Sequence, residues 1–111
     1  GDDIAMLERE VESAVVRYAE ERGCIALKLN GPNDRGKPDR MFCYRNRVLI
    51  REVKRPGEVP TELQWKWIAR FRDQDFDSDY FDTIGKGKTA IDQFIARTDA
   101  EYDRDTLFDD L

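Results

Sequence analysis

The first part of the chain repeats apolar residues at the spacing of a helix. From residue 4 to about residue 22, an apolar side chain returns every three or four positions, as on the buried face of an amphipathic helix. Asp2 or Asp3 can cap the start of this helix, and Gly23 can end it. The residues that predict the buried face are Ile4, Leu7, Val11, Ala14, Val15 and Tyr18.

Alternating apolar and polar residues then predict three strands. The segment IALKL at residues 25–29 reads as a short strand with its apolar residues on one face. Residues 30–38, NGPNDRGKP, are rich in Gly, Pro, Asn and Asp and predict a loop. Two further strands are expected at about 40–45 and 48–54, joined as a hairpin through a two-residue turn at 46–47.

A second helix is predicted from about residue 62 to residue 73. Thr61 is its expected N-cap, and Gln64 stands three residues later, at the position that completes a capping box. The apolar residues that predict its buried row are Leu63, Trp67 and Phe71.

The last part of the chain predicts one more strand and one more helix. Residues 78–84, SDYFDTI, read as a strand, GKGK at 85–88 as a turn, and TAIDQFIAR at 89–97 as a short helix. From Thr98 onward we expect fraying or order that depends on a partner. The order of helix, three strands, helix, strand and helix indicates an α/β fold with a small mixed sheet flanked by helices.

The composition is typical of one highly charged domain. The 111 residues are 40% hydrophobic and 39% charged, and no apolar run approaches the roughly 20 residues of a membrane span. The first residues, GDDIAM, lack the regions of a secretory signal, so we expect a cytoplasmic protein. Cys24 and Cys43 stand apart and the chain has no His, which excludes the usual Cys/His zinc sites.

Charge is distributed unevenly along the chain. The net charge is −5, but residues 28–55 carry nine cations and three anions, a local charge of +6. The last fourteen residues, 98–111, carry six acids and one base, a local charge of −5. A charge run is usually a solvated surface. The alternative is an anion-binding face on an otherwise acidic protein.

Three charged side chains share one face of the predicted hairpin. With a turn at 46–47, Asp39 lies directly opposite Lys54 and diagonal to Glu52, about 7 to 8 Å away between Cα atoms. The simple reading is an ion pair of Lys54 with both acids. Two carboxylates that repel each other in a half-buried pocket favour instead a divalent cation such as Mg²⁺, to which the Val53 carbonyl can add an oxygen.

Such a site supports phosphodiester hydrolysis. A cation held by Asp39 and Glu52 would polarise the phosphate and lower the pKa of a bound water. Lys54 would orient that water or help to deprotonate it, and would stabilise the negative charge of the transition state.

The segment GKGKT at 85–89 invites a nucleotide-binding interpretation. A P-loop requires a Gly five residues before Gly87, where this chain has Asp82. We therefore expect no nucleotide cofactor.

The residues around the charged face resemble a known nuclease family. PD at 38–39 and EVK at 52–54 match the two halves of the PD-(D/E)XK nuclease pattern. The longer stretches GKPDRMF, REVKRPGEVPTELQ and ESAVVRYAEERGCIALKL resemble the VRR-NUC (virus-type replication-repair nuclease) domain over roughly residues 8–96. The resemblance implies a restriction-endonuclease-like core of αβββαβα order. We place this single domain at 1–97, followed by an acidic tail at 98–111.

The resemblance also implies roles for the residues of the site. Asp39 and Glu52 match the family's metal ligands for Mg²⁺ or Mn²⁺, with the Val53 carbonyl on the same ion. Lys54 matches the catalytic lysine. Gln64 matches the family's glutamine, and the alternative role for it is the helix cap.

Two further sets of residues follow from the same comparison. Glu12 matches the glutamate of the family's first helix; Glu8, one turn earlier, is the alternative, and a solvent-facing role is common at such positions. Five cations could contact the DNA backbone, with plain surface cations as the alternative: Lys28, Arg35, Lys37, Arg40 and Arg55.

The implied function is that of a bacterial or phage-encoded deoxyribonuclease. The resemblance suggests a homodimer that cuts branched DNA, either four-way (Holliday) junctions or flaps, and two copies would double a small basic face. The acidic segment DQDFDSD at 73–79 departs from the family pattern, which leaves DNA contacts there in question. The alternatives are a restriction-like or single-strand nuclease with the same site, and a non-catalytic DNA-binding protein with the same fold.

Overall fold

The computed structural model describes the backbone of residues 2–109 and the side chains of residues 7–106. The predicted caps at Asp2 or Asp3 and the predicted burial of Ile4 lie outside the described side chains. Over the described range the elements follow the predicted order αβββαβα. They are α1 (Asp2–Glu21), β1 (Ile25–Lys28), β2 (Arg40–Tyr44), β3 (Arg47–Val53), α2 (Glu62–Asp73), β4 (Asp77–Phe81) and α3 (Ile84–Asp109).

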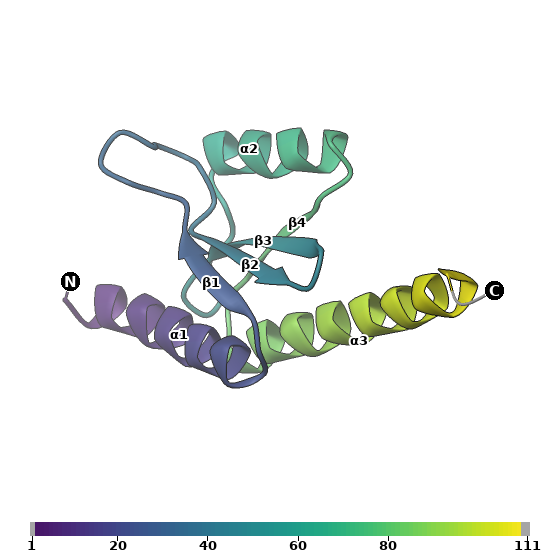
Figure 1. Cartoon of the computed structure of the whole chain (residues 1–111). Coiled ribbons are helices and arrows are strands. Elements are labelled where there is room, and N and C mark those ends of the chain that lie inside the picture. Colours follow the sequence, from purple (N-terminus) through teal and green to yellow (C-terminus); the bar gives the residue numbers. More distant parts are fainter. Residues whose placement is uncertain (1, 110–111) are drawn as a thin grey trace.

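The strands form one mixed sheet between two layers of helices (Figure 1). The strand order is β1-β2-β3-β4, in which β2 runs antiparallel to β1 and β3, and β3 pairs with β4 in parallel. Helix α2 connects β3 to β4 and covers one face, while α1 and α3 lie along the other face (Figure 1). The predicted α/β class with a small mixed sheet is confirmed. Within the described residues, no helix has the length and apolar character needed to cross a bilayer.

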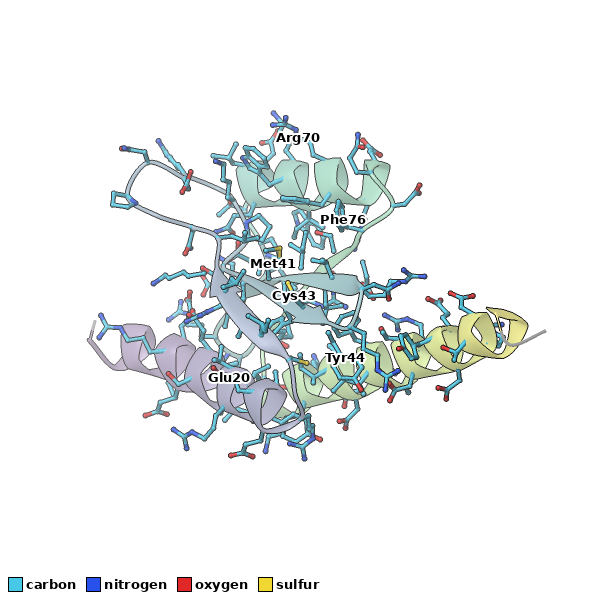
Figure 2. The ribbon with its side chains drawn as sticks, viewed as in Figure 1. Glu20, Met41, Cys43, Tyr44, Arg70 and Phe76 are labelled. Carbon is cyan, nitrogen blue, oxygen red and sulfur yellow. The ribbon has the colours of Figure 1, made fainter. Side chains whose placement is uncertain are left out.

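The main core lies between the sheet and the layer of α1 and α3. Phe42, Leu49 and Val53 point into it from β2 and β3 and are fully buried. On the other face of the sheet Met41 points toward α2, whereas Tyr44 packs against α3 (Figure 2). The helices contribute the remaining buried residues, which are Val11, Val15 and Ala19 from α1 and Ile91 and Phe94 from α3.

The register of the β2–β3 hairpin differs from the prediction by two residues. The turn is 45–46 rather than 46–47. Phe42 lies opposite Leu49, so two fully buried side chains pair, whereas the predicted register would set Phe42 opposite Arg51. Burial of the apolar pair therefore decides the register. Because the slip is two residues, every side chain keeps its predicted face.

The start of α3 corrects the prediction of a turn at 85–88. Strand β4 ends at Phe81, three residues earlier than predicted, and 85–88 belong to the first turns of α3. The Thr83 carbonyl accepts the N–H of Gly87 at 3.0 Å, and its hydroxyl accepts another N–H of the first turn at 3.0 Å. Gly87 is buried against α1, because a Cβ there would collide with Val15. The glycine permits close helix packing rather than a turn.

Helix α3 also continues through residues 98–109, where fraying or partner-dependent order was expected. Asp99 pairs with Arg45 at 3.2 Å, and Glu101 pairs with Arg47 at 3.0 Å. The acidic end of the chain therefore meets the basic hairpin turn, two segments that are far apart in the sequence. Residues 110–111 of the predicted tail lie outside the described residues.

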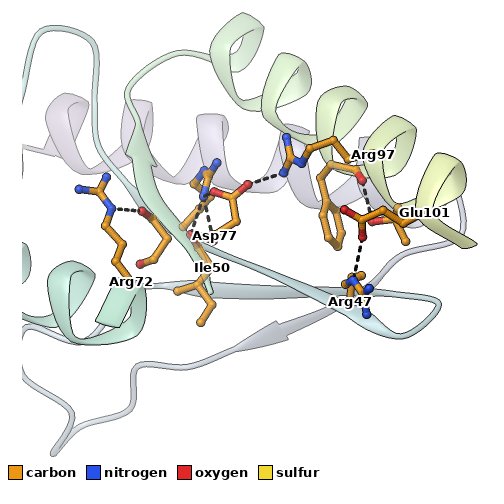
Figure 3. A network of polar contacts seen from close by, with 10 residues as sticks. Arg47, Ile50, Arg72, Asp77, Arg97 and Glu101 are labelled. Atoms are coloured by element: carbon orange, nitrogen blue, oxygen red, sulfur yellow. Dashed lines mark hydrogen bonds and ion pairs between the residues drawn. The ribbon is translucent and has the colours of Figure 1, made fainter. Parts of the chain in front are cut away.

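A polar network links three layers at β4 (Figure 3). The Asp77 carboxylate accepts a hydrogen bond from Arg51 of β3 at 2.9 Å and another from Arg97 of α3. From α2, Arg72 donates to the Ser78 carbonyl at 2.7 Å. Arg51, one of the cations of the basic segment, is 9% exposed. It therefore contributes to internal packing rather than to a basic surface.

Candidate active site

Three charged side chains gather at the end of the hairpin that lies away from its turn. Asp39 precedes β2, Glu52 lies in β3 and Lys54 follows β3 directly. One step beyond the last β2–β3 pair, the register sets Asp39 opposite Glu52, not opposite Lys54 as predicted. Asp39, Glu52 and Lys54 are 8%, 3% and 6% exposed. The two acids are closer neighbours than the sequence suggested, and all three groups are buried.

Hydrogen bonds fix both carboxylate oxygens of Asp39. Oδ2 accepts the backbone N–H of Val53 at 2.7 Å, and Oδ1 accepts the side-chain amide of Asn30 at 2.5 Å. The backbone carbonyl of Asp39 accepts the N–H of Leu29 at 2.9 Å, which extends the β1–β2 pairing into the loop. A carboxylate can accept about four hydrogen bonds or ligands. Asp39 is thus held in place and still has lone pairs for a cation.

Glu52 is a buried carboxyl beside another carboxyl. Burial, followed by the hydrogen bond and the charge of Asp39, raises the pKa of Glu52 to about 10, and the charge of Lys54 acts in the opposite direction. Its Oε2 is buried and has no hydrogen-bond partner among the described residues. An ionised Glu52 at neutral pH therefore needs additional positive charge close to it.

Lys54, which is 6% exposed as a residue, contributes an amine to the same place. Its backbone N–H donates to the Phe81 carbonyl at 2.9 Å, which anchors the residue against β4. Within the part of the chain that the structure describes, Lys54 forms no salt bridge with Asp39 or Glu52. The simple ion pair considered from the sequence is therefore absent from these residues.

The two glutamates of α1 considered for the site, Glu8 and Glu12, have different surroundings. Glu12, the residue that the family resemblance selects, accepts the Nε–H of Arg40 at 2.9 Å and forms an ion pair with its Nη2, also at 2.9 Å. Glu8 has a raised pKa, caused first by burial and then by the charge of Asp39. The structure thus brings Glu8 to the acid pair and engages Glu12 with Arg40. The catalytic role of Glu12 stays a prediction.

Gln64 adopts the capping geometry that the sequence allowed. Its Oε1 accepts the backbone N–H of Thr61 at 2.9 Å, and its own backbone N–H donates to the Thr61 hydroxyl at 3.2 Å. The capping box is confirmed. A catalytic role for the same amide stays a prediction.

The five cations expected to contact DNA fall into two groups. Three of them form ion pairs within the protein, namely Lys37 with Asp34 at 2.7 Å, Arg40 with Glu12 at 2.9 Å and Arg55 with Glu58 at 3.0 Å. Lys28 and Arg35 are exposed and form no ion pair with any residue that the structure describes. The exposed cations near the site are fewer than the sequence suggested.

Asn30 is the site neighbour that the sequence did not single out. It stands in the loop after β1, and its Oδ1 is buried without a hydrogen-bond partner among the described residues. A polar residue just past a strand, one position beyond the residue that lies opposite Asp39, was the only local signal. Its proximity to Asp39 depends on the pairing of β1 with β2, whose register the sequence did not predict.

The donor atoms fit a hard divalent cation. Among the described residues, no group of three or more His, Cys, Asp and Glu side chains is arranged for a metal ion. The donors would be the two acids together with neutral oxygens, a combination that Mg²⁺ accepts with waters completing its shell. The unpartnered Glu52 Oε2 supports this fit, because a buried carboxylate oxygen without a partner is costly. The Val53 carbonyl as a ligand stays a prediction.

Comparison with known proteins agrees with a nuclease family. No family model matches the chain, so the assignment to the VRR-NUC domain stays a prediction. The chain is 38% identical over 64 residues to a protein named "Putative nuclease p44" from Acyrthosiphon pisum secondary endosymbiont phage 1. The match covers 57% of this chain and 69% of the phage protein. The chain belongs to the family of this phage nuclease.

Proposed function

We propose that this protein is a divalent-cation-dependent DNA endonuclease of the VRR-NUC type that hydrolyses phosphodiester bonds in branched DNA. The observation that carries the proposal is the buried pair of Asp39 and Glu52, with an unpartnered carboxylate oxygen and the amine of Lys54 beside it. Membership in the family of a phage protein named as a nuclease supports the same reaction. Mg²⁺ or Mn²⁺ is the cofactor in this proposal.

Asp39, Glu52 and the Val53 carbonyl would hold the cation. When bound, it would supply Lewis-acid polarisation of the phosphate and activation of the attacking water. The protein contributes the fixed position of Asp39, because hydrogen bonds from Val53 and Asn30 hold its two oxygens. Without a cation, Glu52 carries a raised pKa because it is buried beside Asp39. Cation binding and ionisation of Glu52 would therefore occur together.

Lys54 would act on the reacting phosphate. The residue is 6% exposed, and an ammonium in a partly desolvated site interacts with a developing charge more strongly than one in water does. Its role is to stabilise the extra negative charge on the phosphate and to orient the attacking water. Lys54 directly follows β3, two residues after Glu52, at the same end of the hairpin as the two acids.

The preference for branched DNA and the homodimer belong to this proposal. Among the described residues, three of the five cations expected to contact DNA form ion pairs within the protein, so one copy offers little positive charge to hold a branch. A second copy would double that charge. Exposed apolar residues on the edge strand β1 support a dimer, since Ile25 is 62% and Leu27 is 44% exposed.

A cleavage assay in Mg²⁺ or Mn²⁺ tests the proposal. Its labelled substrates are a four-way junction, a flap, a linear duplex and a single strand. Lys54→Ala should lose at least about 100-fold in rate, as the loss of an electrostatic stabiliser does. Lys88→Ala removes the same charge on α3, where its Nζ lies 5.1 Å from the ring centre of Tyr18, and should cut normally.

Cutting confined to junctions and flaps supports the branched-DNA proposal. Cutting of every substrate indicates a restriction-like or single-strand nuclease with the same site. Binding without cation-dependent cutting indicates a DNA-binding protein that keeps the fold. Sedimentation of the full chain decides between monomer and dimer.

A further inference from the structure

Asn30 borders the acid pair but has no assigned role. Its side-chain Nδ2 donates to Asp39 Oδ1 at 2.5 Å. The backbone joins the two positions as well, because the N–H of the preceding Leu29 donates to the Asp39 carbonyl at 2.9 Å. Asn30 is therefore held next to Asp39 by the end of the β1–β2 ladder.

The orientation of the Asn30 amide leaves its oxygen without a partner. A carboxylate only accepts hydrogen bonds, so the NH₂ group must face Asp39 and the oxygen must face away from that contact. This oxygen, Oδ1, is buried and lacks a hydrogen-bond partner within the described part of the chain. Glu52 Oε2 is in the same condition. Both unpartnered oxygens belong to side chains that border Asp39.

We propose that Asn30 is a further residue of the cation site. Its Nδ2 positions Asp39, and its Oδ1 binds the divalent cation or a water of the cation's hydration shell. An Asn carbonyl oxygen is an established ligand type for hard cations, and it is neutral, so it adds no repulsion to a site that already holds two acids. The inference rests on the cation site of the proposed function.

The binding of Mn²⁺ to the full chain tests this role without relying on cleavage. Calorimetric titration and the rise in Tm with Mn²⁺ measure this binding. Asn30→Ala removes the donor and the oxygen, and Mn²⁺ should bind about 10-fold more weakly, as when other supporting residues of metal sites are lost. Asn33→Ala changes an exposed residue of the same loop and should bind Mn²⁺ as the wild type does.

Asn30→Asp separates a cation site from a purely structural contact. It replaces the donor by a carboxylate next to Asp39, so the Tm without cation should fall because like charges repel. Mn²⁺ should then raise the Tm more than it does in the wild type, whereas Asn33→Asp should leave the Mn²⁺-induced rise unchanged. A structural role would lower the Tm of Asn30→Asp by the same amount at every Mn²⁺ concentration, and that result overturns the inference.

Asp39→Asn separates failure of this inference from failure of the proposed function. If Asp39→Asn abolishes Mn²⁺ binding while Asn30→Ala binds as the wild type does, the cation site stands and the role of Asn30 is wrong. If the wild type and Asp39→Asn bind Mn²⁺ equally, the cation site is elsewhere, and both proposals are wrong.

Discussion

Glu52 is the acid of the site whose ionisation is disfavoured most strongly. Burial and the adjacent Asp39 raise its pKa from 4.5 to about 10. Between these values the folded state binds a proton that the unfolded chain has released. The contribution of Glu52 to stability is therefore complete below the unfolded pKa and is lost as the pH rises toward 10.

In the absence of divalent cations, the free energy of unfolding should thus decrease from about pH 6 to about pH 9, by at most about 1.4 kcal/mol per pH unit. Glu52→Gln removes the titrating group and should flatten this profile, so that the variant exceeds the wild type at high pH. Urea denaturation in EDTA measures both, with the exposed Glu20→Gln as control. Equal slopes for the wild type and Glu52→Gln would contradict this account.

Glu8 and Glu12, the two α1 glutamates considered for the site, should differ in their effect on cleavage. Burial and the charge of Asp39 raise the pKa of Glu8, whereas Glu12 accepts hydrogen bonds from Arg40. We expect Glu8→Gln to lower the cleavage rate by about 10- to 100-fold, as for a group that supports a metal site. Glu12→Gln keeps an oxygen for Arg40 and should lower it less. Initial cleavage rates of the two variants on one DNA substrate measure this difference, and Tm values check that both variants fold. A larger loss of rate for Glu12→Gln would support the role that the family resemblance assigns to Glu12.

At the level of elements, features set by neighbouring residues in the sequence were predicted better than features set by contacts between distant residues. Helix α2 matches the predicted 62–73, because Thr61 and Gln64 define its start within four residues. The hairpin register depends on which buried side chains pair across the hairpin. The start of α3 depends on its packing against α1, and its C-terminal extent depends on ion pairs with the hairpin turn. None of these partners can be identified from local spacing alone.

The same distinction applies to the site. Asp39, Glu52 and Lys54 were predicted to share a face, because the face of a side chain depends only on whether its position along the strand is odd or even. The two-residue difference in register leaves these faces unchanged. Asn30 was not singled out, and Glu8 was only the alternative to Glu12, because their proximity to the acids depends on the pairing of β1 with β2 and on the rotation of α1. Those features are fixed by packing.

Close packing of α1 and α3 depends on Gly87. Gly87→Ala should lower the free energy of unfolding by about 1–3 kcal/mol, because its Cβ would overlap Val15 and crowd Phe81 in a filled core. Gly85→Ala is the matched control, since a Cβ there has no neighbour within 4 Å, and alanine in a helix stabilises by up to about 1 kcal/mol over glycine. Urea denaturation of both variants measures the difference; equal stabilities would indicate that α1 shifts to accommodate the methyl group.

Across the whole molecule, ion pairs within the fold use up much of the basic segment. Arg45 and Arg47 at the hairpin turn pair with Asp99 and Glu101 of α3. The turn also lies at the opposite end of β3 from the candidate site, a separation of about 20 Å for a seven-residue strand. Its cations therefore contribute to folding. Lys28 and Arg35, which are exposed, are better placed to contact a DNA backbone.

DNA binding as a function of salt distinguishes these two pairs of cations. Each phosphate contact by a cation adds about 0.9 to the slope of log K against log salt concentration for duplex DNA. The double variant Lys28→Ala/Arg35→Ala should therefore reduce this slope by about 1.8. Arg45→Ala with Arg47→Ala removes the same net charge, yet it should leave the slope nearly unchanged and lower the Tm instead. Fluorescence titration in Mg²⁺-free buffer from about 50 to about 200 mM salt measures both. An equal loss of slope in the two double variants would mean that net charge governs binding, and that no particular face of the protein contacts the DNA.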